Sequence, residues 1–402
     1  MAELSKCVII DKEKYLFGAA FNIIKPLDIS EVISLSGGWE LVLNSNSHYV
    51  ILRGKDYKGD LNDFSLYCYE VIQKGLDLLS INGKADISIE SGNEEYYLWW
   101  KTEKQYFRIV RLIDFNLKSS VNISAIDQNG DSVNLIPKKV TKHHESLRYY
   151  RLSQVTEDLF DAFRNMYLAF ESLLSLNTNR RKGEKEGDWL KRALNNLAYF
   201  KGNSELFGNK NMNIVDKFYK EIYIEVRCKL FHAKSNQKKL IPQNLQDRKK
   251  VSEAFQILTQ VVLMLADNLL GINRETAIVT NSGFSSIFSD NFKSINILFS
   301  ERKDQLSLYE SKTDELHKCS FSLKAFYSKS LSTPGISYYT GSVNPLKIKN
   351  VSSMNRFALT LENELMSIHK IDELTFEGID EIEVNLGYRL QNSNLPKNTF
   401  YH

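Results

Sequence analysis

Residues 214–232 of this 402-residue chain are IVDKFYKEIYIEVRCKLFH, an amphipathic stretch that predicts one helix from Ile214 to about Phe231. Arg227 and His232 stand at its end with four residues between them. Arginine is a permanent planar cation that matches phosphate geometry, and histidine takes or gives a proton near neutral pH. Such a pair can cleave a phosphodiester without a metal. The structural alternative is a cap, because basic residues near a helix C-terminus interact favourably with its dipole.

Helical periodicity surrounds this segment on both sides. Apolar residues recur at steps of three and four from Leu152 to Leu173, which predicts a long first helix. Further helices are expected at Trp189–Phe200 and Arg248–Leu270, with Gly271 as the C-terminal stop of the last one. Residues 146–272 are therefore expected to form an all-helical domain, a four-helix bundle.

The two flanking regions, residues 1–145 and 273–402, are expected to be β-rich domains, which makes the chain an α+β protein. One helix is predicted in each, at Asp63–Leu79 and at Met354–His369. Alternation of apolar and polar residues predicts short strands. The predicted strands are Tyr49–Arg53, Ala85–Glu90, Tyr106–Arg111, Val121–Ala125, Ser294–Phe299, Phe321–Phe326, Leu346–Lys349 and Ile382–Leu386. The aromatic run Tyr96–Trp100 could stack bases, but alternation would bury half of it, which favours core packing.

Composition indicates a soluble globular protein, with 43% hydrophobic and 25% charged residues. The four cysteines are scattered, so neither a disulfide framework nor a zinc site is expected, and no motif calls for a cofactor. The N-terminus has too short an apolar run for a signal peptide, and polar residues interrupt the apolar stretch Phe255–Leu270. A cytoplasmic location is expected.

Positive charge is concentrated around the arginine and histidine. Residues 146–271 contain 21 lysines and arginines against 14 aspartates and glutamates, a net charge of +7, whereas the rest of the chain carries −4. Such a bias favours a polyanionic partner, although a solvated helical face also produces it. Arg180, Arg181 and Lys182 are open to the same two interpretations, as a loop that binds phosphate or as a solvated run of charges.

The helical middle resembles the HEPN superfamily, whose nuclease members carry an arginine, four to six residues and a histidine. Arg227 and His232 match this motif. The loop and helix at Gly183–Leu194 look like those of the ApeA-like and MauJ-like HEPN domains. The resemblance covers roughly Leu147 to Gly271 and neither flanking region.

This resemblance implies metal-independent RNA cleavage at a site where two HEPN domains face each other, and hence a homodimer. His232 would transfer a proton or orient the 2′-OH, and Arg227 would stabilise phosphate charge. Glu171 could orient Arg227 or be an exposed helix acid. Lys229 and Lys234 would hold the RNA backbone.

One departure from the family motif bears on activity. Cys228 follows the arginine, where active members usually carry Asn, Asp or His, and it is retained as a supporting residue. It favours the alternative function, a non-catalytic binding or assembly protein that dimerises through its HEPN bundle.

His143 and His144 are interpreted as linker residues, since no second ligand group lies at a metal-binding spacing. By family analogy, the role would be defence against phage by abortive infection or a stress response, with the β-rich domains sensing a trigger.

Overall fold

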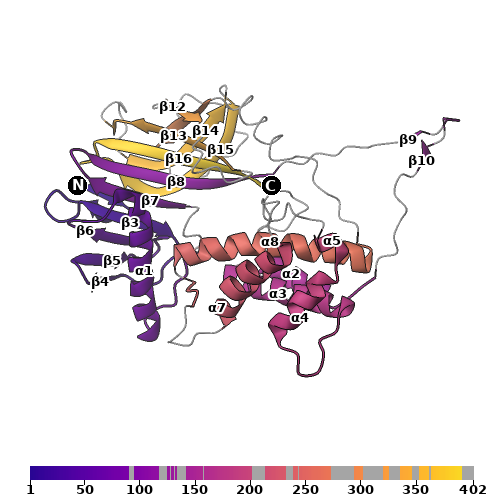
Figure 1. The fold of residues 1–402 in the computed structure, drawn as a ribbon. Helices are drawn as coiled ribbons and strands as arrows, with labels where there is room; N and C mark the ends of the chain where they lie inside the picture. Colours follow the sequence, from indigo (N-terminus) through magenta and orange to yellow (C-terminus); the bar gives the residue numbers. More distant parts are fainter. Residues whose placement is uncertain are drawn as a thin grey trace. The chain divides into compact units, whose positions relative to one another are not determined.

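In the computed structural model the chain forms two compact units, each described by itself (Figure 1). One unit contains Met1–Phe115 and Asn281–Leu390, and the other contains Asn116–Thr280 and Gln391–Tyr401. The structure describes residues 1–89, 95–116, 125–126, 128–130, 132–133, 142–156, 158–201, 213–231, 239–242, 244–272, 294–301, 320–325, 336–345, 353–361 and 364–391.

The first unit contains a sheet of fourteen described strands in the order β2-β1-β15-β14-β11-β12-β13-β16-β8-β7-β3-β6-β5-β4. These strands are β1 (Ala2–Leu4), β2 (Cys7–Ile10), β3 (Phe17–Asn22), β4 (Glu31–Leu35), β5 (Trp39–Leu43), β6 (Tyr49–Gly54), β7 (Glu95–Lys101), β8 (Gln105–Asn116), β11 (Ser294–Ser300), β12 (Ser320–Ala325), β13 (Ile336–Val343), β14 (Ser353–Leu361), β15 (Glu364–Thr375) and β16 (Glu381–Gln391). Helix α1 (Phe64–Ile81) agrees with the helix predicted from Asp63 to Leu79. A separate pair, β9 (Ala125–Ile126) and β10 (Ser132–Val133), belongs to the second unit.

Strands from the beginning and the end of the chain share this sheet, as the purple and yellow arrows of Figure 1 show. Leu4 of β1 pairs with Leu374 of β15, and Arg108 of β8 donates to Glu383 of β16 at 2.7 Å. The sequence predicts two separate β-rich domains, whereas the observed sheet joins both regions. Pairing between strands hundreds of residues apart leaves no trace in the local alternation from which strands are predicted.

Two predicted elements of the sheet unit are wrong. The helix expected at Met354–His369 is replaced by the antiparallel strands β14 and β15, which pair from Leu361 and Glu364 onward. Seven consecutive residues of β14 are buried, so both faces are covered and the alternation that distinguishes a strand is missing. The described part of Ala85–Glu90 forms only an isolated bridge between Ile23 and Ile89.

The other strand predictions fare better. Tyr49–Arg53, Tyr106–Arg111, Ser294–Phe299 and Ile382–Leu386 all lie within strands, as do the described residues of Phe321–Phe326. Leu346–Lys349 and most of Val121–Ala125 fall outside the described residues. In β7, Tyr97 and Trp99 are fully buried, which confirms core packing for the aromatic run.

The second unit is helical. Its helices are α2 (Ser146–Val155), α3 (Leu159–Asn177), α4 (Glu186–Asn195), α5 (Ala198–Lys201), α6 (Ile214–Phe218), the π-helical segment η3 (Tyr219–Cys228), α7 (Lys229–Phe231) and α8 (Leu245–Leu270). The single helix predicted from Leu152 to Leu173 is broken, because the Asp158 side chain caps α3 by accepting from the Asp161 backbone N–H. Gly271 ends α8 with a left-handed φ of 68°, as predicted.

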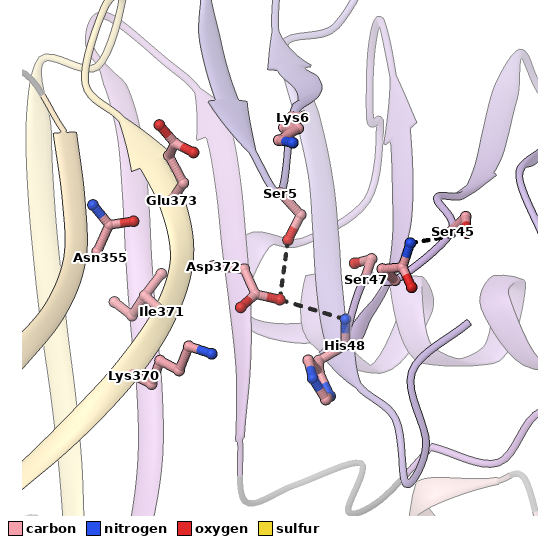
Figure 2. Close-up of a pocket in the computed structure, with 11 residues that line it drawn as sticks. Ser5, Lys6, Ser45, Ser47, His48, Asn355, Lys370, Ile371, Asp372 and Glu373 are labelled. Carbon is pink, nitrogen blue, oxygen red and sulfur yellow. Dashed lines mark hydrogen bonds between the residues drawn. The ribbon is translucent and has the colours of Figure 1, made fainter. Parts of the chain in front are cut away.

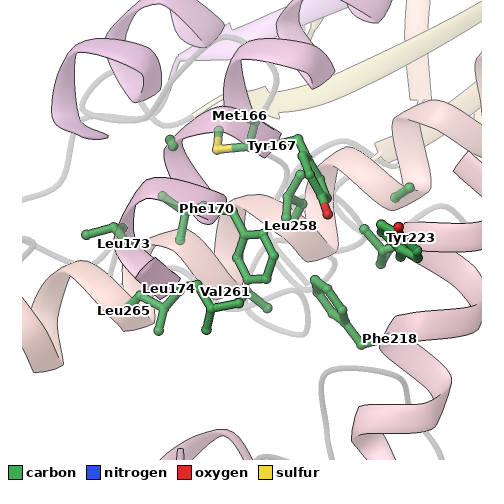
Figure 3. Close-up of a cluster of buried hydrophobic side chains, with 14 of the residues drawn as sticks. Met166, Tyr167, Phe170, Leu173, Leu174, Phe218, Tyr223, Leu258, Val261 and Leu265 are labelled. Atoms are coloured by element: carbon green, nitrogen blue, oxygen red, sulfur yellow. The ribbon is translucent and has the colours of Figure 1, made fainter. Parts of the chain in front are cut away.

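The core of this unit lies between α3, α8 and the helix that begins at Ile214 (Figure 3). Phe170 of α3, Phe218 of α6 and Leu258 of α8 are fully buried there, and each such side chain contributes roughly 1.5–3 kcal/mol through its burial. By length and composition α8 could cross a membrane, but half of its apolar window is buried inside the unit, as in the core helix of a soluble protein. The structure therefore confirms an α+β protein with a helical region, while the four-helix arrangement and the cytoplasmic location stay predictions.

Candidate functional site

Arg227 lies near the end of a continuous helix that runs from Ile214 to Phe231, as predicted. Its central ten residues, Tyr219–Cys228, are π-helical. A π-helix bonds each residue to the fifth one along, is rare, and is found frequently at functional sites. The irregular segment therefore coincides with the arginine of the predicted motif.

Aromatic rings surround the Arg227 guanidinium. Its Cζ lies 5.0 Å from the ring centroid of Phe231, 5.5 Å from that of Tyr223 and 5.4 Å from that of Tyr167 on α3. Tyr219 continues the same helix face, since its ring stacks on Tyr223 with centroids 5.2 Å apart. Rings at these distances attract a cation and restrict the rotamers of a long side chain. Arg227 is thus held by packing from two helices.

Glu186, the first residue of α4, is the ion-pair partner of Arg227. The distance between Arg227 Nη2 and Glu186 Oε1 is 2.9 Å, and only 16% and 20% of the two side chains are exposed. Oε1 meets no hydrogen-bond geometry, so the contact is an ion pair by distance and is not also a well-aligned hydrogen bond. The sequence offers one signal for this residue, an acid in the first turn of a helix, and that signal is ordinarily explained by the helix dipole.

The neighbouring glycine lets α4 approach the π-helical segment. A Cβ atom placed on Gly187 would lie 2.7 Å from Tyr219 Oη, closer than such atoms come in proteins. On the next turn of α4, Lys191 Nζ lies 4.3 Å from the Tyr219 ring centroid. Tyr219 therefore packs against the start of α4, which carries the Glu186 carboxylate to Arg227.

Glu171, for which the sequence left open a role in orienting Arg227 or an exposed position, is half-buried on α3. Burial raises the pKa of its carboxyl, the nearby charge of Glu186 raises it further, and Arg227 lowers it. The charge of Arg227 thus affects the pKa of Glu171, but Arg227 forms its ion pair with Glu186. A role for Glu171 stays a prediction.

Two tyrosines at the site also have shifted pKa values. Burial raises the pKa of Tyr223 to about 12, and the charge of Glu186 adds to the effect. Burial also raises the pKa of Tyr167 well above its usual value, again with Glu186 as the next cause. Perturbed groups gather at functional sites, although structural ion pairs perturb pKa values too. Both tyrosines stay protonated at neutral pH and can donate a hydrogen bond.

The residues beside Arg227 are partly engaged. The half-buried Cys228 packs against the helical core. Lys229 Nζ donates to Glu225 Oε2 at 2.5 Å, and Lys250 donates to the same oxygen at 2.6 Å. The hydrogen bond from Lys229, followed by the one from Lys250, lowers the pKa of Glu225 to about 2. Lys229 would have to leave this ion pair before it could bind an RNA phosphate.

The basic loop before α4 is folded around Glu184. Arg180 Nε donates to the Glu184 backbone carbonyl at 2.7 Å, and the Arg181 backbone N–H donates to its carboxylate at 2.9 Å. Arg192 pairs with the same carboxylate at 2.7 Å. The side chains of Arg180, Arg181 and Lys182 are exposed, so the ordered loop presents them to solvent. Their predicted contact with phosphate stays a prediction.

Other predicted site residues are not placed. His232 and Lys234 lie outside the described residues. His144 forms a local hydrogen bond, with 3.0 Å between its Nδ1 and Ser146 Oγ at the start of α2, while His143 is exposed. Within the described residues, no group of three or more His, Cys, Asp or Glu side chains could hold a metal ion.

Residues 146–266 match the family model described as methylamine utilization protein MauJ. This is a HEPN-like family, so the match confirms the resemblance of the helical region. It covers the Arg227 site and leaves both β-rich regions unmatched. No curated protein and no solved structure was found to match the chain.

Proposed function

We propose that this chain, whose helical region matches a HEPN-like family, is an endoribonuclease that uses no metal ion. The 2′-oxygen of a ribose attacks the adjacent phosphorus and the bond to the 5′-oxygen breaks. The 2′-OH proton passes to a base and the leaving oxygen receives a proton, for which His232 is the candidate. The products are a 2′,3′-cyclic phosphate and a 5′-OH, and DNA is inert because it lacks the 2′-OH.

The observation that carries this proposal is the fixed position of Arg227. Three rings and one carboxylate hold the Arg227 guanidinium in place. A preorganised cation stabilises charge developing on phosphate oxygens without reorganising during the reaction. The Glu186 carboxylate contacts Arg227 at the terminal nitrogen Nη2. We propose that the guanidinium held there binds a phosphate with its remaining donor groups.

The catalytic site is proposed to form between two chains. One arginine and one histidine supply few catalytic groups, and a two-fold dimer would bring both pairs together. Specific activity should then rise with protein concentration and level off once the dimer is saturated. Activity strictly proportional to concentration over a range that spans dissociation of the dimer would contradict a composite site.

A second candidate function is supported by the burial of Arg227. With 16% of its side chain exposed and a partner at 2.9 Å, the arginine could serve only to bind α4 to the π-helical segment. The helical unit would then be a dimerisation module, and the β-rich unit would carry the binding or assembly function. Cys228 beside the arginine favours the same alternative.

Cleavage of labelled RNA in excess EDTA separates the two functions. The parent should cleave RNA and leave the matching DNA intact, and His232→Ala should lower the rate at least a hundredfold, as loss of a proton-transfer group does. The matched control is His143→Ala, since His143 is exposed and near α2. Equal cleavage by the parent and His232→Ala would exclude the proposed mechanism.

The biological role proposed for this nuclease is RNA degradation in defence against phage or in a stress response. Such an enzyme must be restrained in a healthy cell, and the β-rich unit is proposed to sense the trigger. RNA is the expected partner of the helical unit, whose sequence carries the positive charge.

A further inference from the structure

A polar pocket of about 370 Å³ lies in the sheet unit (Figure 2). Three segments far apart in the sequence form it: the β1–β2 turn with Ser5 and Lys6, the β5–β6 turn with residues 45–48, and the paired part of β14 and β15 with Asn355 and residues 370–373. Pockets of a few hundred cubic ångströms with several converging polar groups are typical of small-molecule sites. All three segments belong to the same compact unit.

Backbone strain is concentrated at this pocket. Among the described residues, four that are not glycine have a positive φ: Ser5 at 51°, Lys6 at 61°, Asn46 at 64° and Glu373 at 36°. All four line the pocket. Asparagine tolerates this conformation, but lysine and glutamate adopt it at a cost in free energy that glycine would avoid. The chain keeps long charged side chains where glycine would be more stable, a pattern found at functional sites.

A bulge in β15 forms one wall. Met354 pairs with Leu374 and Arg356 with Lys370, so Asn355 alone faces Ile371, Asp372 and Glu373. Bulges redirect side chains and are frequent beside binding sites. Here the three bulged residues and Asn355 all line the pocket.

Asp372 ties the three segments together. Its backbone carbonyl accepts from the Ser5 N–H at 2.9 Å. Its Oδ2 accepts from Ser5 Oγ and from the His48 backbone N–H, both at 3.4 Å, as the dashed lines in Figure 2 show. The position of Lys370 in β15 is also fixed, because the buried Arg111 donates to the Lys370 carbonyl at 3.0 Å. The pocket is therefore a built feature of the sheet and does not depend on one loop.

The lining indicates the chemistry of a ligand. Lys6 and Lys370 are exposed, and neither forms an ion pair with a described residue. Serine hydroxyls, asparagine amides and the Asp372 carboxylate supply groups that bind hydroxyls. Among the described residues that line the pocket there is no Phe, Tyr or Trp, so the large rings on which a base usually stacks are missing, and His48 supplies a single imidazole.

We propose that this pocket binds a small phosphorylated sugar. Lys6 and Lys370 hold the phosphate, while Asp372 and the serine hydroxyls of the two turns hold sugar hydroxyls. The proposal concerns the sheet unit alone and does not depend on RNA cleavage by the helical unit.

Isothermal titration of the full chain with ribose 5-phosphate, inorganic phosphate and ribose tests the proposal. Ribose 5-phosphate should bind saturably and at least tenfold more tightly than either of the other two compounds. Lys370→Ala should weaken it at least tenfold, whereas Lys12→Ala, an exposed lysine away from the pocket, should leave it unchanged.

Lys6→Gly separates a binding role from a structural one. Glycine adopts the left-handed conformation at position 6 without strain, so the melting temperature should rise. The affinity for ribose 5-phosphate should fall, because the lysine charge is lost. No saturable binding of ribose 5-phosphate, equal affinity for phosphate and ribose 5-phosphate, or unchanged affinity in both lysine variants would each overturn the proposal.

Discussion

Arg227 on the π-helical segment and Glu186 at the start of α4 form an ion pair, with 2.9 Å between Nη2 and Oε1, and both side chains are largely shielded from solvent. The pair links two helices that meet through Gly187 and Tyr219. In the proposed nuclease this contact fixes the cation that meets the scissile phosphate.

Glu186→Gln should weaken both stability and catalysis. Removing the charge leaves the shielded Arg227 cation without its partner, which should lower the free energy of unfolding by about 1–3 kcal/mol. RNA cleavage should fall by about tenfold or more, because a loosened arginine stabilises the transition state less well. Urea denaturation and initial cleavage rates measure the two effects. The control Glu221→Gln removes an acid that is 45% exposed and lies 4.0 Å from Lys217, and should change stability by less than about 0.5 kcal/mol.

Glu171→Gln should behave differently from Glu186→Gln. Because burial raises the pKa of Glu171, its charged form opposes folding, and that cost grows as pH rises through the titration of the carboxyl. At pH 7 the amide should leave the melting temperature unchanged or slightly higher, with cleavage retained. If Glu171→Gln abolished cleavage while Glu186→Gln did not, the partner that orients Arg227 would be Glu171.

Gly187→Ala should damage the site by steric conflict. The added methyl would meet Tyr219 Oη at 2.7 Å, and overpacking of this kind costs about 1–3 kcal/mol. Combining it with Tyr219→Phe removes the nearest atom and should recover part of the loss. Urea denaturation of both single variants and of the double variant gives the coupling free energy between positions 187 and 219. Additive losses would show that the glycine and the tyrosine do not meet.

Lowering the pH should reduce the stability of the helical unit, because the Glu184 carboxylate becomes protonated. The hydrogen bond from Arg192, followed by the one from the Arg181 backbone, lowers the pKa of Glu184 to about 2, below the value of about 4.3 for an unfolded chain. A depressed carboxyl pKa stabilises the fold above the unfolded value, and this contribution is lost as pH falls from about 4.3 toward 2. The melting temperature of Glu184→Gln should therefore vary less with pH over this window than that of the parent. Identical profiles would contradict the contribution of Glu184.

Local patterns in the sequence predicted the helical unit in part, since the single helix expected at Trp189–Phe200 is observed as α4 and α5. The helix from Ile214 to Phe231 and the stop at Gly271 are confirmed, because 3.6-residue periodicity and a left-handed glycine are local signals. The break after Val155 was missed, since the apolar pattern continues across the cap at Asp158. For β14 the pattern misled, because a strand buried on both faces lacks alternation.

The candidate site was predicted in part. The chemistry of Arg227 and its place near a helix end follow from residue type and spacing alone. Its partner Glu186 did not, because a contact between residues 41 positions apart depends on how α4 packs. The bulge opposite Asn355 was missed for the same reason, since its register is set by pairing across strands.

The central claim is that Arg227 acts on phosphate during RNA cleavage, and the most direct measurement is the cleavage rate of Arg227→Lys in excess EDTA. Lysine keeps the charge but lacks the planar fork that can contact Glu186 and phosphate together, so the rate should fall by about a hundredfold. The control Arg151→Ala, which replaces an exposed arginine of α2, should cleave RNA at the parent rate. The parent and this control should both leave a 2′,3′-cyclic phosphate end. Cleavage by a folded Arg227→Lys at the parent rate, or no cleavage by the parent, would contradict the account.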